Sequence, residues 1–205
     1  KARVEEELED YYELIGVRKI VMNQKLAKLV DLAGRLRFQK RWAQTPRIPE
    51  TAVLGHMLVV AILSYFYSLE VKACKTRLEN NFFCALFHDL PESLTRDIIS
   101  PVKYGIEGLN EIISEYEMRL IDEKILPFVP EDKFNAIDGK ALKFCDKLAA
   151  FFEAGISISY GVKSNELTEG FNNMDKFFQK NQSLDGVNFS KICDDFKEHF
   201  SLLQV

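Results

Sequence analysis

The chain has 205 residues, enough for one compact domain with a substantial buried core. With 47% hydrophobic and 28% charged residues it has the composition of an ordinary soluble protein, and its 16 phenylalanines predict an aromatic interior. The net charge of -4 argues against general binding of nucleic-acid backbones, which need a basic face.

The beginning of the chain predicts a polar arm and then a core helix. VEEELEDYYEL, residues 4–14, is acidic and is expected to form a solvated helical arm. In residues 23–42 apolar side chains recur at helical spacing, which predicts a first core helix running to about Trp42. These side chains are Leu26, Leu29, Val30 and Ala33.

Two apolar helices are expected next. Pro46 and Pro49 interrupt the first helix, and Thr51 is expected to cap a helix over residues 51–69. Its apolar run is short for a membrane span and contains a histidine, so we expect a buried helix and no membrane partner. Another helix is predicted over residues 75–88.

The rest of the chain also has helical periodicity. Residues 100–126 predict one or two helices that end at Pro127, and residues 133–154 predict a strong one. FNNMDKFFQ and NFSKICDDFKEHFSLL predict terminal helices. No segment has a convincing alternating strand pattern, so the predicted fold class is all-α.

The cysteines indicate a reducing environment. The four of them are scattered, with no CxxC pair, and no secretory signal peptide is recognised, so we expect a cytoplasmic protein in which they are small core residues. They are Cys74, Cys84, Cys145 and Cys193.

Histidine is scarce, which makes its placement informative. Of the three, His56 and His88 fall in apolar helices, where an imidazole needs a polar partner. Each alone is more often a hydrogen-bonded core residue, and a single His-Asp pair is common by chance. His199 lies in the polar final helix with no chemical group beside it.

Together, four residues on three predicted helices form a candidate metal site. In chain order they are His56, His88 with Asp89, and Asp146. Two imidazoles and two carboxylates suit Mn²⁺, Fe²⁺, Co²⁺, Ni²⁺ or Zn²⁺ better than Ca²⁺. A catalytic ion in this site would need open positions for water and substrate.

This order of ligands resembles the HD-domain metal-dependent phosphohydrolases. HDLPESLTRDIISPVKY, residues 88–104, resembles the segment that follows the His-Asp pair in the 5'-deoxynucleotidase branch, including Glu92, Thr95 and Asp97. The resemblance extends to two more motifs. Arg41-Trp42 has a spacing from His56 similar to that in the branch, and CDKLAAFFEA, residues 145–154, resembles the family's last motif.

The resemblance implies an HD-domain helical bundle around one divalent metal ion, as a single domain over residues 1–205. Its core would span about residues 26–160, with the N-terminal arm and the C-terminal helices packed on it, often as a homodimer. The implied activity is hydrolysis of a nucleoside 5'-monophosphate, most simply a deoxynucleotide, by metal-activated water.

The resemblance also implies roles for residues around the metal. Glu92 would transfer the proton and Asp97 would position the water or the sugar, while Arg41 and Lys103 would bind phosphate and Trp42 would line the nucleoside pocket. Each has a structural alternative. In that alternative, Glu92 is a solvated acid at a helix start and Asp97 caps the following segment. Arg41 and Lys103 are then surface cations, and Trp42 packs between helices.

Two positions depart from the branch. Arg96 stands where a Gly is common before the second Asp, and Gly55 stands where an acidic residue commonly precedes the first His, which removes a partner that would orient His56. Two rival functions stay open: another HD phosphohydrolase, acting on a cyclic dinucleotide, a triphosphate or an alarmone, and a non-catalytic regulatory module with a structural metal.

Overall fold

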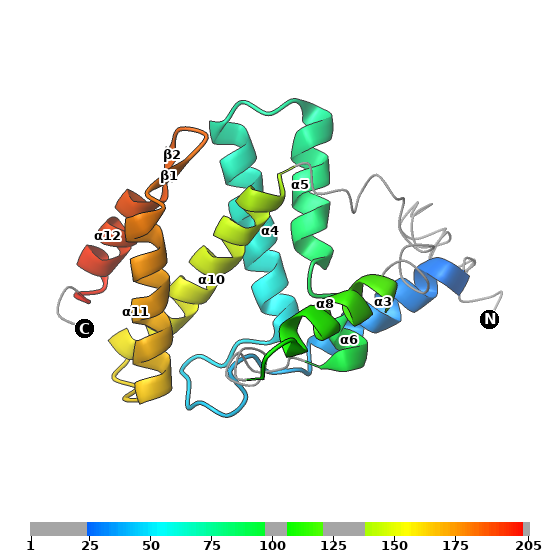
Figure 1. The fold of residues 1–205 in the computed structure, drawn as a ribbon, viewed down its shortest axis with the longest axis horizontal. Helices are drawn as coiled ribbons and strands as arrows, with labels where there is room; N and C mark the ends of the chain where they lie inside the picture. The colour runs from blue at the N-terminus through cyan, green and yellow to red at the C-terminus, as the bar shows by residue number, and fades with distance from the viewer. Residues whose placement is uncertain (1–23, 97–105, 121–137, 203–205) are drawn as a thin grey trace, which may run out of the picture. The chain divides into compact units, whose positions relative to one another are not determined.

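The structure, a computed structural model, describes residues 24–96, 106–120 and 138–202 (Figure 1). Internal contacts divide the chain into two units. The first combines Lys1–Leu36 with Leu90–Glu131, and the second combines Arg37–Asp89 with Asp132–Val205. The described residues are mostly helical, which confirms the all-α class. The single-domain organisation stays a prediction.

Among the described residues, five helices belong to the second unit. They are α4 (Val53–Glu70), α5 (Lys75–Phe87), α10 (Gly139–Ser159), α11 (Asn165–Lys180) and α12 (Phe189–His199). Helix α5 turns back along α4, α10 crosses α4, and α11 packs on α10 and α12 (Figure 1). The predicted helices over 51–69, 75–88 and the C-terminal region are confirmed with small shifts of their ends.

Aromatic rings fill the core between α10, α11 and α12, as the composition predicts. Phe151 and Phe171 stack with ring centroids 4.5 Å apart, and Phe144 meets Phe189 edge to face at 5.0 Å. Such pairs contribute about 0.5 to 1.5 kcal/mol beyond their buried area. Gly155 lets α12 come this close, since a Cβ there would lie 2.5 Å from the Phe196 ring.

A short hairpin between α11 and α12 has no counterpart among the predicted elements. Strand β1 (Ser183–Leu184) pairs antiparallel with β2 (Val187–Asn188). Asp185 and Gly186 turn the chain with φ angles of 51° and 88°. The Asp-Gly dipeptide is a strong signal for a two-residue hairpin turn, but strands of two residues are too short to show alternation.

The first helix ends earlier than predicted. Helix α3 (Gln24–Leu36) does not continue to Trp42. Instead, Lys40 forms an isolated antiparallel bridge with Ala52, and the Arg41 N–H donates to the Thr51 carbonyl at 2.9 Å. Residues 40 and 41 use their backbone groups in this pairing and so cannot continue helix α3. Helical periodicity of the local sequence cannot predict such a pairing.

The expected capping by Thr51 is also wrong. Ala52 is the N-cap of α4 and provides no side-chain hydrogen bond. The Thr51 hydroxyl instead accepts from Nη2 of Arg47 at 3.0 Å. The buried guanidinium needs this acceptor, so Thr51 belongs to a tertiary contact.

The first unit contains α3, α6 (Glu92–Thr95) and α8 (Leu109–Leu120), with α3 packed against α6. Helix α8 lies within the predicted helical segment 100–126. Val30 was expected in the core, but it is 52% exposed.

Helix α4 is the one helix among the described residues that is long and apolar enough to cross a membrane, and 44% of it is buried. All four cysteines are free. Three are buried, as predicted, whereas Cys74 is exposed. The cytoplasmic location stays a prediction.

Candidate metal centre

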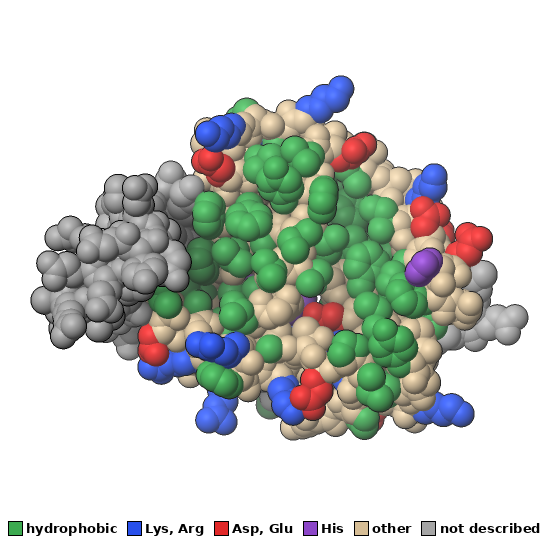
Figure 2. Space-filling view, turned by 180° about the vertical axis from the view of Figure 1, so that it is seen from behind, with side chains coloured by type: hydrophobic (Ala, Val, Ile, Leu, Met, Phe, Trp, Pro, Cys, Tyr) green, Lys and Arg blue, Asp and Glu red, His purple; other side chains and the backbone are tan. Residues whose placement is uncertain are grey.

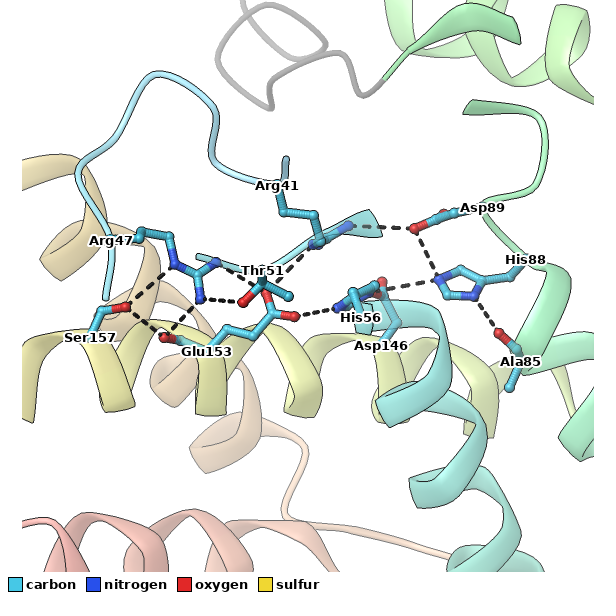
Figure 3. A network of polar contacts seen from close by, with 10 residues as sticks. All are labelled: Arg41, Arg47, Thr51, His56, Ala85, His88, Asp89, Asp146, Glu153 and Ser157. Carbon is cyan, nitrogen blue, oxygen red and sulfur yellow. Dashed lines mark hydrogen bonds and ion pairs between the residues drawn. The ribbon is translucent and has the colours of Figure 1, made fainter. Parts of the chain in front are cut away.

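Two histidines and one aspartate converge from three helices of the second unit. His56 lies on the buried face of α4, His88 is the C-cap of α5, and Asp146 lies near the middle of α10 (Figure 3). One donor atom from each lies within 4.8 Å of the other two. The crossing of α10 over α4 brings together residues that are 90 positions apart.

His56 is fully buried between two carboxylates of α10. Its Nδ1 lies 2.9 Å from Oε1 of Glu153, and its Nε2 lies 3.0 Å from Oδ1 of Asp146. The two acids are two helical turns apart and therefore project from the same side of α10. The imidazole is thus fixed at both nitrogens.

The two nitrogens of the His88 ring have different surroundings. Its Nδ1 lies 2.7 Å from the Ala85 carbonyl oxygen, which can only accept, so Nδ1 carries a proton. Its buried Nε2 has no partner with hydrogen-bond geometry in the described structure, although Oδ2 of Asp89 lies 3.3 Å away. A buried nitrogen without a hydrogen bond is a candidate position for a ligand. Imidazole nitrogen and carboxylate oxygen together form a donor set that transition metals accept.

Two arginines flank Glu153. Arg47 donates from Nη1 to Oε2 at 3.4 Å and from Nη2 to the Glu153 carbonyl at 3.2 Å. Nε of Arg41 lies 3.5 Å from the same carboxylate oxygen, Oε2. Glu153 therefore connects the imidazole of His56 to two cations.

Neighbouring charges shift the pKa values of His88 and Asp146. Burial alone would lower the pKa of His88, but the negative charges of Asp89 and Asp146 raise it to about 9. Burial would raise the pKa of Asp146, but the hydrogen bond with His56 and the charge of His88 hold it below its usual range. A divalent cation would replace the His88 proton as the counter-charge.

Asp89 is placed differently from the other three predicted ligands. The group of donor atoms within 4.8 Å of one another consists of His56, His88 and Asp146. Asp89 lies beside this group, with Oδ2 3.4 Å from Nη1 of Arg41. The positive charges of His88 and Arg41 hold the pKa of Asp89 below its usual range against the opposing effect of burial.

Two of the residues predicted to bind the substrate, Arg41 and Trp42, lie in the loop before α4. A pocket of about 310 Å³ lies along Lys40–Arg47 and includes Arg41 and Trp42. The tryptophan ring also packs on α11, because a Cβ on Gly170 would lie 2.8 Å from its Cη2. Trp42 therefore packs against α11 and also lines the pocket.

The remaining predicted residues belong to the segment after His88. Glu92 is buried in α6 of the first unit. Asp97 and Lys103 lie outside the described residues. Arg96 follows α6 with a φ of 65°, in the left-handed region that glycine favours.

Glu153 and Arg47 are polar neighbours of the centre that sequence reasoning missed. Glu153 lies in CDKLAAFFEA, seven residues after Asp146, which is a helical same-face spacing. That spacing was the available signal. Arg47 lies between two prolines in a loop, where nothing local predicts a buried guanidinium.

Comparisons with known proteins found a matching family model and a curated relative. A family model described as an HD domain matches residues 33–133, which include His56, His88 and Asp89. A 5'-deoxynucleotidase of Pasteurella multocida (strain Pm70) is 21% identical over 159 residues, covering 67% of this chain and 77% of that protein.

Two solved structures have a similar fold. The HD phosphohydrolase DatZ of cyanophage S-2L, bound to dA and one catalytic Zn²⁺ ion, is 18% identical with a TM-score of 0.60, covering 84% of this chain and 94% of that one. An HD-domain phosphohydrolase of Listeria innocua is 21% identical with a TM-score of 0.66, covering 84% and 90%. The chain therefore resembles the HD-domain phosphohydrolases and has their fold.

Proposed function

We propose that the protein is a metal-dependent phosphomonoesterase that hydrolyses nucleoside 5'-monophosphates, with deoxynucleotides as the preferred class. The convergence of His56, His88 and Asp146, with the buried Nε2 of His88 lacking a hydrogen bond, carries this proposal. The 5'-deoxynucleotidase relative and the dA-bound phosphohydrolase support the substrate class.

His56 and His88 would hold one divalent ion through their Nε2 atoms, Asp146 would hold it through a carboxylate oxygen, and we propose Asp89 as a fourth ligand. The donor set accepts Mn²⁺, Co²⁺, Fe²⁺, Ni²⁺ or Zn²⁺. When bound, such an ion polarises a phosphoryl oxygen and lowers the pKa of water. Asp89 as a fourth ligand would also keep its neighbour Arg41, whose Nη1 lies 3.4 Å from Oδ2.

The residues around the ion have proposed roles in binding and proton transfer. Arg41 would bind the phosphate through its planar guanidinium, which presents two parallel donors, and Lys103 would add a second cation. Trp42 would pack against the nucleoside from the pocket wall. Glu92 would return a proton to the leaving 5'-oxygen, and Asp97 would orient the water or the sugar.

A panel of nucleoside and deoxynucleoside monophosphates, assayed with Mn²⁺ or Co²⁺, tests the proposal. The expected product is inorganic phosphate, with higher turnover of deoxynucleotides. Release of pyrophosphate or tripolyphosphate from triphosphates alone would favour another HD phosphohydrolase. Bound metal without phosphate release from any monophosphate would contradict the proposal.

Glu92→Ala separates the enzyme from a non-catalytic metal module. We expect the variant to keep its bound metal and to lose phosphate release by about 10² to 10⁴-fold, the usual contribution of a general acid or base. Glu169→Ala, which removes an exposed carboxylate of α11, is the matched control. Equal turnover in Glu92→Ala and the control would remove Glu92 from the mechanism.

We also propose that the protein forms a homodimer through the outer face of α4. Six apolar residues of this helix are between 38% and 62% exposed at helical spacing: Leu58, Val59, Ile62, Tyr65, Phe66 and Leu69. Figure 2 shows a face of the molecule on which hydrophobic side chains gather. Contiguous apolar surface of this kind is typical of an interface between subunits.

Phe66→Arg, measured by light scattering after size exclusion, tests the dimer. The wild type is expected to have twice the monomer mass and the variant the monomer mass, since a buried unpaired cation disfavours association. Phe38→Arg is a control, because Phe38 is exposed but does not lie on α4. A monomeric wild type would contradict the homodimer, and a dimeric variant would place the contact elsewhere.

A further inference from the structure

Helix α10 presents two acids to one imidazole, and they cannot have the same role. Asp146 lies at Nε2 of His56 and is 40% exposed, whereas Glu153 lies at Nδ1 and is 9% exposed. Nε2 of His88 also lies on the Asp146 side, 4.0 Å from Oδ1. An ion therefore has three donors on the Nε2 side of His56, while Glu153 lies on the opposite side of the ring.

Glu153 is held in place by more than its contact with His56. Arg47, whose side chain is only 3% exposed, reaches its carboxylate, its backbone carbonyl and the hydroxyls of Thr51 and Ser157. A guanidinium with this many acceptors is rigid and stays charged. It keeps Oε1 of Glu153 directed at the imidazole and neutralises a carboxylate that would otherwise be costly to bury (Figure 3).

The position before His56 explains why the acid is needed on α10. Gly55 offers no side chain to His56, and a Cβ there would meet only a methyl group of Thr51, at 4.0 Å. The acidic partner expected at this position from the resemblance is therefore missing from α4. In its place, a carboxylate from a different helix meets Nδ1.

We propose that Glu153, clamped by Arg47, is the positioning residue of the metal centre. It accepts the Nδ1 proton of His56, which fixes the ring orientation and leaves the Nε2 lone pair for the ion. This inference rests on the metal site of the proposed function. Carboxylates hydrogen-bonded to metal-ligating histidines typically change metal affinity or activity by about 10 to 100-fold when they are removed.

Glu153→Gln is the decisive variant, because it keeps the shape and removes the charge. Zn²⁺ affinity, measured by competition with a chelator, is expected to fall about 10 to 100-fold. In the Zn²⁺-loaded wild type, proton NMR should show a downfield, slowly exchanging Nδ1 proton of His56, which moves upfield and exchanges faster in the variant. Glu169→Gln, on the exposed face of α11, should match the wild type in both measurements.

Unchanged Zn²⁺ affinity and an unchanged His56 proton signal in folded Glu153→Gln would overturn the inference. If that variant does not fold, Glu153→Asp keeps the charge beside Arg47 but withdraws the oxygen by one methylene, and the same shifts are expected. A wild type that binds Zn²⁺ but releases no phosphate would overturn the proposed function and leave this test intact. A wild type that binds no Zn²⁺ would overturn both.

Discussion

The second unit contains two polar networks that join the same three helices, α4, α5 and α10. One is the metal centre. The other, called here the Asp138 network, links Ser64 and Ser68 of α4 with Arg77 and Asn81 of α5 and with Asp138, the N-cap of α10. Both networks include an aspartate from α10 or its N-cap, but their hydrogen bonding differs.

In the Asp138 network the donors have acceptors within the protein. Arg77 donates from Nε and Nη2 to Asp138 at 2.7 and 2.8 Å, and Asn81 donates from Nδ2 to Asp138 at 2.7 Å and to Ser68 at 3.0 Å. In the metal centre, the buried Nε2 of His88 has an ion-pair neighbour, Oδ2 of Asp89 at 3.3 Å, but no partner with hydrogen-bond geometry among the described residues. A satisfied network stabilises the fold, whereas an unsatisfied one is a place for a ligand.

Asp146→Asn should have the largest effect of these variants, and the effect should be on metal binding at the metal centre. Four-ligand zinc sites bind with roughly 10 to 16 kcal/mol, so losing one charged ligand should cost about 3 kcal/mol, or more than a hundredfold in Zn²⁺ affinity. Phosphate release should be lost with it. Unfolding of the metal-free variant should change less than that of Asp138→Asn. Wild-type metal affinity would remove Asp146 from the site.

Asp138→Asn should show the opposite pattern. The change leaves the charged Arg77 facing a neutral amide and replaces charge-assisted hydrogen bonds, so the free energy of unfolding should fall by about 2 to 3 kcal/mol in urea titrations. Zn²⁺ affinity should stay within about twofold of the wild type. A large loss of affinity would mean that the two networks are coupled through α10.

The same variant predicts a pH dependence. The hydrogen bond from Arg77 lowers the pKa of Asp138 below 3.8, its ordinary value, despite the opposing effect of burial. A carboxyl whose pKa is lower in the folded state stabilises the fold fully when the pH is above its pKa in the unfolded state. This stabilisation is lost as the pH falls through its pKa in the folded state. The difference in unfolding free energy between wild type and Asp138→Asn should be constant above about pH 5 and shrink below pH 4. A difference that grows on acidification would contradict this assignment.

Ser68→Ala should give the smallest effect. Its hydroxyl accepts from Asn81 and donates to the Ser64 carbonyl at 2.8 Å, and the variant loses both of these neutral hydrogen bonds. Each typically contributes about 1 kcal/mol, so the free energy of unfolding should fall by about 1 to 2 kcal/mol. Metal binding should not change. A thermal midpoint equal to that of the wild type would show that another group, such as water, satisfies Asn81.

The metal centre was partly predictable because its residues lie in strongly periodic helices. His56, His88 and Asp146 each fall on a segment whose apolar pattern identifies a helix, and the resemblance gave their order. The supporting residues were harder. Arg47 lies in a loop and contacts Glu153, which is 106 positions away. Lys40 pairs with Ala52 in a region where the apolar pattern predicts a continuing helix. Sequence patterns report short-range repetition, and these contacts are long-range.

The backbone at Arg96 changes how the departure from the branch is understood. With a φ of 65° this arginine occupies a conformation that costs a residue with a Cβ about 1 to 2 kcal/mol and costs glycine almost nothing. The substitution therefore keeps a path of the chain that suits glycine and alters the charge at that point. Because the strain lies in the backbone, replacing Arg96 with another residue that has a Cβ would change the charge at this point and leave the strain in place.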